Sequence, residues 1–256
     1  MISISQLWIL AKQGYASNFR PLLGLALIPY ALVLLTVLVM FIQNVGLGIL
    51  DEGLVRTLYQ VISSLLIAAT YVVLFVFSNL SALAMMIMIK ESTVTMTMRQ
   101  ALTKAGPFLW RYIWVDILVT LLLFLWGLLF IIPAIIMAVN YSMAIWILLE
   151  GQYSGYGTIK QSKILVRGYW WAIFGRQLIL IILAIIIFAI LAGISWSIFG
   201  PASVRGNEQG SGNEIFSALI NIVTALIMPF YMIYLYNIYK NLVAIKNQAL
   251  ASPVSH

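Results

Sequence analysis

The sequence predicts an all-α integral membrane protein with six transmembrane helices, and three observations support this prediction. Of the 256 residues, 63% are hydrophobic and only 8% are charged, whereas an ordinary soluble domain carries about 25% charged residues. The mean hydropathy is +1.05. Apolar runs, each close to the roughly 20 residues that cross a bilayer, alternate with short segments that contain most of the Lys and Arg. So few charges cannot cover a water-soluble globule of this size.

The first span is expected at 21–43 and the second at 60–89. The first apolar run begins near Leu22 and is longer than the apolar part of a secretory signal, so we expect it to remain uncleaved. A stretch with the pattern of an amphipathic helix precedes it. The second span exceeds the length that a bilayer requires, which predicts tilting or projection beyond the hydrocarbon.

The third and fourth spans are expected at 112–131 and 133–149. Pro133 divides one long apolar stretch between them, and no charge lies between Asp116 and Glu150. The turn must therefore be very tight or partly embedded.

The fifth and sixth spans are expected at 177–199 and 215–239. Pro229 is expected to kink the sixth, with the freed carbonyl bonded by a neighbouring group. Turn-forming residues predict external loops at 44–53 and 200–213. All six spans are assigned to one membrane domain that covers 1–256.

The distribution of cations predicts the orientation of the chain. If the N-terminus is cytoplasmic, the inside segments hold 12 of the 14 Lys and Arg, and only Arg56 and Arg205 lie outside. The positive-inside rule then places both termini in the cytoplasm. The twelve inside cations are Lys12, Arg20, Lys90, Arg99, Lys104, Arg111, Lys160, Lys163, Arg167, Arg176, Lys240 and Lys246.

A weak internal repeat predicts three helical hairpins, each introduced by a short interfacial helix on the cytoplasmic side. The segments AKQGYASNFRPLLG, LTKAGPFLWRYIW and LVRGYWWAIFGRQL share a cation, a glycine, aromatic residues and an Arg in that order. The glycine-to-Arg spacing varies between them. Unrelated membrane boundaries also collect Lys, Arg and Trp, so true repetition and chance similarity both stay open.

The run IKQSKILVRGYWWAIFGR at 159–176 is the first candidate site. On a helix, Lys160, Lys163 and Arg167 fall within one arc, with Ile159, Leu165 and Val166 opposite. This pattern predicts an interfacial amphipathic helix. The candidate contacts to lipid headgroups and the interface are Lys160, Lys163, Arg167, Tyr169, Trp170, Trp171 and Arg176. Membrane anchoring alone and specific headgroup recognition both explain the run, and no nucleic-acid partner is expected.

Polar residues inside the spans form the second candidate group: Asn79, Asp116, Asn140 and Asn221. Each amide should face another helix or a wet cavity, because an unpaired amide in hydrocarbon is costly. Interhelical hydrogen bonds and a path for a substrate or ion are both consistent with three amides in alternate spans. Asp116 is expected to reach the surface or to pair with Arg111 or Arg176.

No catalytic, cofactor or metal site is expected. The chain has no Cys, and its one His is the terminal His256. We find no HExxH, Walker loop, GxSxG or cluster of carboxylates. The chain is therefore expected not to be an enzyme.

The stretch FIIPAIIMAVNYSMAIWILLEGQYSGYGTIKQSKILVRGYWWAIFG resembles the central part of two related groups. One is the YciC-like family of bacterial inner-membrane proteins, and the other is the membrane domain found with some glycerophosphoryl diester phosphodiesterases. The motif residues include Pro133, Glu150, Ser162 and Gly168, whereas Ala134 replaces the usual glycine. The resemblance implies a helical domain in the bacterial inner membrane. It does not imply phosphodiesterase activity, which belongs to a separate soluble barrel.

Two functions remain in view. The first is a non-enzymatic membrane protein that organises or interacts with lipids or partner membrane proteins through its interfacial helices, with anionic headgroups on the cytoplasmic side. The alternative is a small transporter or lipid-translocating protein whose polar path passes Asn79, Asn140 and Asn221.

Overall fold

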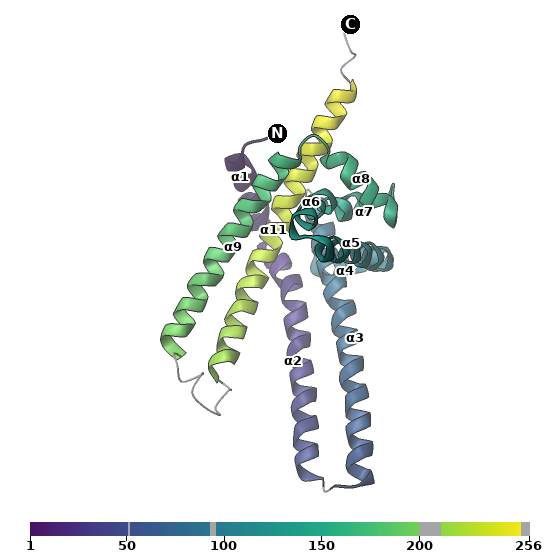
Figure 1. The fold of residues 1–256 in the computed structure, drawn as a ribbon, viewed down its shortest axis with the longest axis vertical. Coiled ribbons are helices and arrows are strands. Elements are labelled where there is room, and N and C mark those ends of the chain that lie inside the picture. Colours follow the sequence, from purple (N-terminus) through teal and green to yellow (C-terminus); the bar gives the residue numbers. More distant parts are fainter. Residues whose placement is uncertain (51, 93–95, 200–210, 252–256) are drawn as a thin grey trace.

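The computed structural model describes residues 1–50, 52–92, 96–199 and 211–251, and every regular element in these ranges is helical (Figure 1). The elements are α1 (Ile4–Ser17), α2 (Phe19–Ile49), α3 (Leu54–Lys90), α4 (Met98–Ala105), η1 (Gly106–Phe108), α5 (Leu109–Leu129), α6 (Ile131–Tyr141), α7 (Ala144–Leu149), α8 (Tyr156–Val166), α9 (Trp170–Phe199) and α11 (Ser211–Ala251). Six helical stretches within these ranges are long and apolar enough to cross a membrane, which confirms the predicted fold class.

The helices form three similar units, each a short helix followed by a pair of longer helices. The short helices are α1, α4 and α8, and the pairs are α2 with α3, α5 with α6, and α9 with α11. This arrangement confirms the three predicted hairpins. The short helices end differently: α1 ends at Asn18, α4 continues into η1, and α8 ends before Gly168, whose φ is +89°. These different breaks explain the unequal glycine-to-Arg spacing.

Several helices are longer than the hydropathy pattern predicts. The helix α2 reaches Ile49 and α3 begins at Leu54, so most of the expected 44–53 loop is helical. Within it, Gly46 lets the Tyr59 ring approach the α2 backbone, because a side chain at 46 would overlap that ring. The Tyr59 hydroxyl donates to the Ile42 carbonyl at 3.0 Å. The prediction of a loop here was wrong, because this contact holds the polar turns of both helices together.

The fifth and sixth spans also differ from their predicted limits. The helix α9 begins at Trp170 instead of 177, and α11 continues to Ala251, well beyond 239. The expected external loop at 200–213 lies outside the described residues, except for the first residues of α11. The polar residues that mark a membrane boundary do not end these helices, because they retain helical hydrogen bonds on either side of the interface.

Both expected proline effects have a local structural basis. Phe130 alone separates α5 from α6, in an extended conformation, and Pro133 lies in the first turn of α6, where a missing N–H is tolerated. In α11, Pro229 cannot donate to the Ala225 carbonyl. The Tyr15 hydroxyl of α1 donates instead to the next carbonyl, that of Leu226, at 3.0 Å. A neighbouring helix therefore bonds to the backbone at this proline, as predicted.

The buried core lies at one end of the molecule. It combines α1, α4, α7 and α8 with the adjoining turns of α2, α3, α5, α9 and α11, and we call this region the head. Leu7, Leu83, Leu148, Ile159 and Leu242 are fully or almost fully buried there. The N-terminal helix and the C-terminal end of α11 both lie at the head (Figure 1). Helix α5 runs across the direction of α2 and α3.

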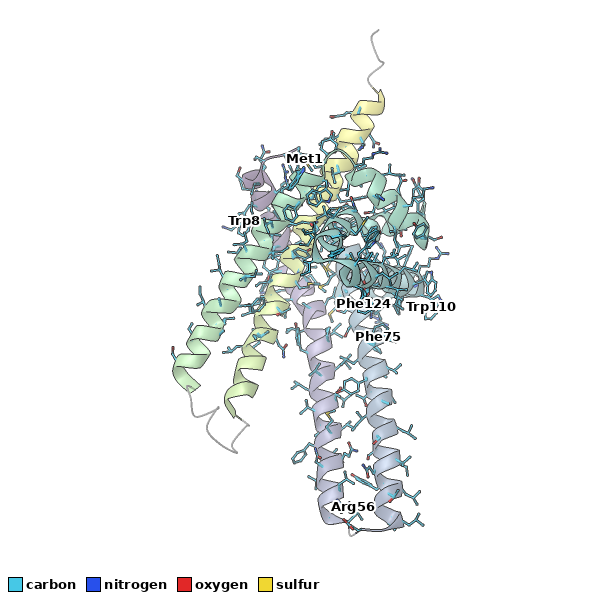
Figure 2. All side chains as sticks on the ribbon, viewed as in Figure 1. Met1, Trp8, Arg56, Phe75, Trp110 and Phe124 are labelled. Carbon is cyan, nitrogen blue, oxygen red and sulfur yellow. The ribbon has the colours of Figure 1, made fainter. Side chains whose placement is uncertain are left out.

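Away from the head, the long hairpins expose apolar side chains. Leu34 is 71% exposed and Val72 is 63% exposed. Figure 2 shows side chains projecting from both faces of the α2–α3 hairpin, with Arg56 at its far tip. Arg56 is thus far from the head, as its predicted separation from the other cations requires, whereas Arg205 lies outside the described residues. The exposed hairpins form a surface suited to lipid contact.

Candidate functional site

Helix α8 presents two chemically different faces. Thr158, Ile159, Ser162 and Val166 are buried, whereas Lys160, Lys163 and Arg167 at the helix end are exposed. Ile164 is 50% exposed on the cationic side, as the helical projection predicts. The predicted amphipathic helix is therefore present, and its polar buried residues are explained by the hydrogen bonds described below.

The three α8 cations line one pocket of 840 Å³ between α6, α8 and the start of α9. We call it the basic pocket. Its lining comprises Asn140, Tyr141, Tyr156, Ile159, Lys160, Lys163, Ile164, Arg167, Gly168 and Trp170, and none of these is acidic. Cations, hydroxyl groups, an amide and an indole thus share a single concave surface.

The charges in the basic pocket are not neutralised by carboxylates. The ion pairs found among the described residues lie elsewhere: Lys90 with Glu150 at 3.6 Å, and Lys104 with Glu91. Within the same part of the chain, no carboxylate is paired with Lys160, Lys163 or Arg167. Three uncompensated positive charges in one concavity attract anions more strongly than the same charges spread over a flat surface.

Trp170 forms a fixed wall of the pocket. Its indole N–H donates to the Ile136 carbonyl at 3.2 Å, and its ring stacks on Phe174 at 5.0 Å between centroids. The two other aromatic residues of the predicted site lie differently. Trp171 is 78% exposed, and Tyr169 lies beneath Lys246, whose Nζ is 5.8 Å from the ring centroid. Only Trp170 of the three lines the pocket.

Ser162 connects the buried face of α8 to the opposite wall of the pocket. Its hydroxyl donates to the Asn140 carbonyl at 2.6 Å and accepts from the Met143 N–H at 3.2 Å. These two groups lie at the break between α6 and α7, where helical hydrogen bonding is interrupted. Ser162 therefore satisfies both ends of the break and holds Asn140 beside the cations.

Arg176 is not part of the basic pocket, although the sequence grouped it with the other cations. Its Nη2 donates to the Ile2 carbonyl at 2.7 Å, and its Nη1 donates to the Ala172 carbonyl at 2.7 Å. The side chain lies half-buried inside the head and connects α9 to the N-terminus. Ten residues along α8 and α9 separate it from Gly168 by more than two helical turns, so it faces another part of the head.

The intramembrane amides do not lie together. The Asn79 side chain donates to the Phe75 carbonyl of its own helix at 2.8 Å, and Asn221 is exposed on α11. Asn140 lies in the basic pocket, and its nearest polar contact is the sulfur of Met137 at 3.8 Å. Asp116 is half-buried and forms no ion pair within the described residues, so the pairing with Arg111 or Arg176 is not observed.

The motif residue Glu150 closes α7 through Lys90. The Lys90 ammonium contacts the Glu150 carboxylate and also donates to the Leu149 carbonyl at 2.6 Å. Sequence reasoning identified Glu150 as a boundary residue but missed Lys90, as it missed Tyr141 and Tyr156 in the basic pocket. The last two have a weak signal in the sequence, since each is an aromatic residue at the polar end of an apolar helix.

The fold and the pocket define a class: a polytopic helical membrane protein with a basic, aromatic-walled pocket where a short amphipathic helix meets a membrane span. No family model, curated protein or solved structure matches the chain. The resemblance to the YciC-like family and to the phosphodiesterase-associated membrane domain stays a prediction.

Proposed function

We propose that this protein is a non-enzymatic membrane protein that binds an anionic phospholipid headgroup in the basic pocket. One observation carries the proposal: Lys160, Lys163 and Arg167 line the same pocket as Trp170, without a carboxylate partner in the described chain. The pocket adjoins a membrane span, where the phosphates of lipids are the most abundant anions. The site is assigned to the cytoplasmic leaflet of a bacterial inner membrane, following the charge distribution and the family resemblance.

The chemistry of the lining suits a phosphodiester. Arg167 can donate two parallel hydrogen bonds to phosphate oxygens, while the ammonium groups of Lys160 and Lys163 act as point charges. The Tyr156 hydroxyl and the Asn140 amide supply further donors and acceptors for a headgroup. Each cation near an anionic membrane contributes about 1 kcal/mol. Three cations acting together correspond to roughly a hundredfold in affinity.

The alternative, a transporter with a polar path, loses the observation that motivated it. Asn140 lines the basic pocket, whereas Asn79 bonds to its own helix and Asn221 is exposed on a different helix. We therefore propose headgroup binding and do not propose transport.

Removing the three pocket cations should abolish selective retention of anionic lipid. The variant Lys160→Ala, Lys163→Ala, Arg167→Ala is purified in native nanodiscs, and retained phospholipids and proteins are measured by mass spectrometry. We expect a loss of retained anionic phospholipid of roughly tenfold to a hundredfold relative to zwitterionic lipid.

The matched control removes three exposed cations outside the basic pocket: Lys12→Ala, Arg20→Ala, Arg99→Ala. It changes the net charge equally and should reduce retention by threefold or less. Equal losses in both variants would show that the pocket is not selective. Loss of a co-purifying protein, with lipid unchanged, would assign the pocket to a protein partner instead.

The proposed orientation is tested with single cysteines, because the chain contains none. Glu52→Cys lies at the far tip of the α2–α3 hairpin, and Thr103→Cys is exposed on α4 in the head. In intact cells, a membrane-impermeant maleimide should label the cysteine at 52 and not the one at 103. Permeabilised cells should show labelling of both. The reverse pattern would place the head outside and contradict the cytoplasmic assignment.

A further inference from the structure

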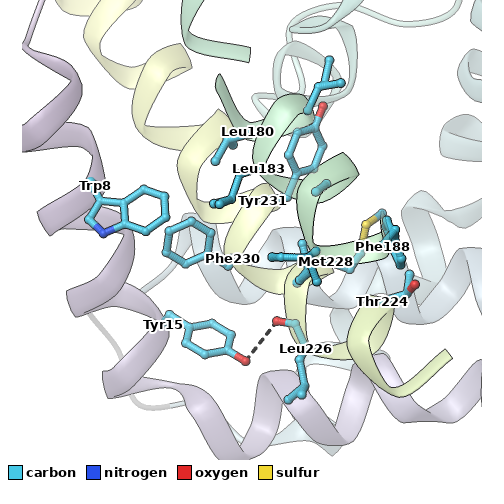
Figure 3. A pocket seen from close by; sticks show the side chains of 14 residues that line it. Trp8, Tyr15, Leu180, Leu183, Phe188, Thr224, Leu226, Met228, Phe230 and Tyr231 are labelled. Carbon is cyan, nitrogen blue, oxygen red and sulfur yellow. Dashed lines mark hydrogen bonds between the residues drawn. The ribbon is translucent and has the colours of Figure 1, made fainter. Parts of the chain in front are cut away.

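A second cavity lies between α1, α9 and α11 and has a volume of 420 Å³ (Figure 3). Helix α1 contributes Trp8 and Tyr15 on one side, and residues of α9 and α11 such as Leu180 and Phe230 form the rest. The volume falls within the range of small-molecule binding sites. The cavity is distinct from the basic pocket, with which it shares no lining residue.

The wall of this cavity offers hydrocarbon and ring faces. Its hydroxyl groups are already bonded to the protein backbone: Tyr15 donates to the Leu226 carbonyl at 3.0 Å, and Thr224 donates to the Ile220 carbonyl at 2.8 Å. Trp8 packs edge-on against Phe230, with ring centroids 4.9 Å apart. A ligand with many polar groups would find few partners here, whereas an alkyl chain would not need any.

The cavity lies along membrane-spanning segments of α9 and α11. Its lining on α9 extends from Leu180 to Phe188, a distance of about 12 Å at the helical rise. This is less than half of the roughly 30 Å thickness of bilayer hydrocarbon. The cavity is therefore placed to exchange with the acyl region of the leaflet nearest the head.

Two buried donors without partners lie one turn before the cavity on α9. Gln177 is only 8% exposed, and neither its Nε2 nor the Nε of Arg176 has a hydrogen-bond partner within the described chain. Gln177 shares a helix face with Leu180 and Ala184, which line the cavity three and seven residues further along. A buried donor without an acceptor is costly, so these groups indicate an acceptor that the protein itself does not supply.

We propose that the cavity binds an acyl chain of a diacyl phospholipid, whose ester carbonyl accepts hydrogen bonds from Gln177 and Arg176. The alkyl chain matches the apolar walls, and the ester is an acceptor that carries no proton of its own to pair. The ester lies at the head end of the chain, as the order of Gln177, Leu180 and Ala184 along α9 requires. This inference stands independently of headgroup binding in the basic pocket.

The test compares diacyl and dialkyl phosphatidylcholine, which differ in the ester carbonyl. A zwitterionic headgroup keeps the basic pocket out of the comparison. The full chain is purified, exposed to each lipid in turn, and the retained lipid is counted by native mass spectrometry. We expect wild type to prefer the diacyl lipid by roughly threefold to tenfold, and Gln177→Leu to lose this preference. Equal retention of both lipids by wild type would overturn the proposal.

A second pair of variants tests the cavity itself. Ala184→Phe fills the space, and Ile185→Phe places the same group on the neighbouring position, which is 59% exposed to lipid. Retention of the diacyl lipid should fall about tenfold for the first and stay unchanged for the second. Unchanged retention in both variants would contradict the proposal.

A measurement on wild type avoids any folding defect of the variants. Phosphatidylcholine with a photoreactive diazirine in one acyl chain should form adducts on the α1 peptide that contains Trp8 and Tyr15. Adducts confined to the exposed faces of α2 and α3 would overturn the proposal. Preferential retention of a free fatty acid, or occupation by a helix of another protein, would also overturn it.

Discussion

Replacing Ser162 with valine is expected to lower the free energy of unfolding by about 2–4 kcal/mol. Valine has nearly the same size but no hydroxyl, and the Ser162 side chain is completely buried. The substitution therefore leaves the Asn140 carbonyl and the Met143 N–H without their partner at the break between α6 and α7. Thermal unfolding in detergent, followed by helical circular dichroism, would measure the loss.

A matched serine lies in the same break. The Ser142 hydroxyl donates only to the Val139 carbonyl, within its own helical turn, at 2.8 Å. Ser142→Ala should therefore change the free energy of unfolding by less than about 0.5 kcal/mol. If both substitutions destabilise equally, the long-range role of Ser162 is wrong. We also expect Ser162→Val to weaken retention of anionic lipid, because Asn140 and Tyr141 form the wall that Ser162 holds.

Replacing Gly168 with alanine is expected to lower the free energy of unfolding by about 1–2 kcal/mol. Gly168 has a φ of +89°, which L side chains rarely adopt, and it ends α8 two residues before α9 begins. A Cβ at this position would meet no heavy atom within 4 Å. The expected cost is therefore one of backbone conformation and not of steric overlap. Since Arg167 and Trp170 flank this residue, relaxation of the strain should also displace two walls of the basic pocket.

The control is the same substitution at Gly127, inside α5. A Cβ there also meets nothing within 4 Å, but the backbone is helical. Gly127→Ala should leave stability unchanged or raise it by up to about 1 kcal/mol. Chemical denaturation of both variants in the same detergent would compare them. A stabilising Gly168→Ala would contradict the argument from backbone conformation.

Much of the fold follows from local sequence patterns. Apolar runs of bilayer length predict the six spans, and the spacing of Lys160, Lys163 and Arg167 predicts the exposed face of α8. The weak repeat predicts the three hairpins with their short leading helices. These features depend on periodicity and composition over a few turns, which a single sequence displays directly.

The remaining parts depend on contacts between distant residues. Ser162 meets residues 19 and 22 positions away, and Arg176 meets the Ile2 carbonyl, 174 positions away. The sequence shows Arg176 as one more cation of a basic run, because it contains no sign of the backbone carbonyl that will surround it. Helix ends were also missed, since contacts such as that of Tyr59 with α2 extend helices through polar residues. Tertiary packing decides these points, and local pattern does not.

The position of the core at one end has a consequence for how the protein resists unfolding. Leu83 and Leu242 are fully buried in the head, whereas Leu34 and Val72 on the hairpin are mostly exposed. Side-chain packing therefore secures the chain in one half of the bilayer, and the acyl chains of lipids must confine it in the other. Such a protein carries a gradient of mechanical stiffness across the membrane. Changes in bilayer thickness or lateral pressure would move the hairpin ends first and leave the packed end, with both chain termini, nearly fixed.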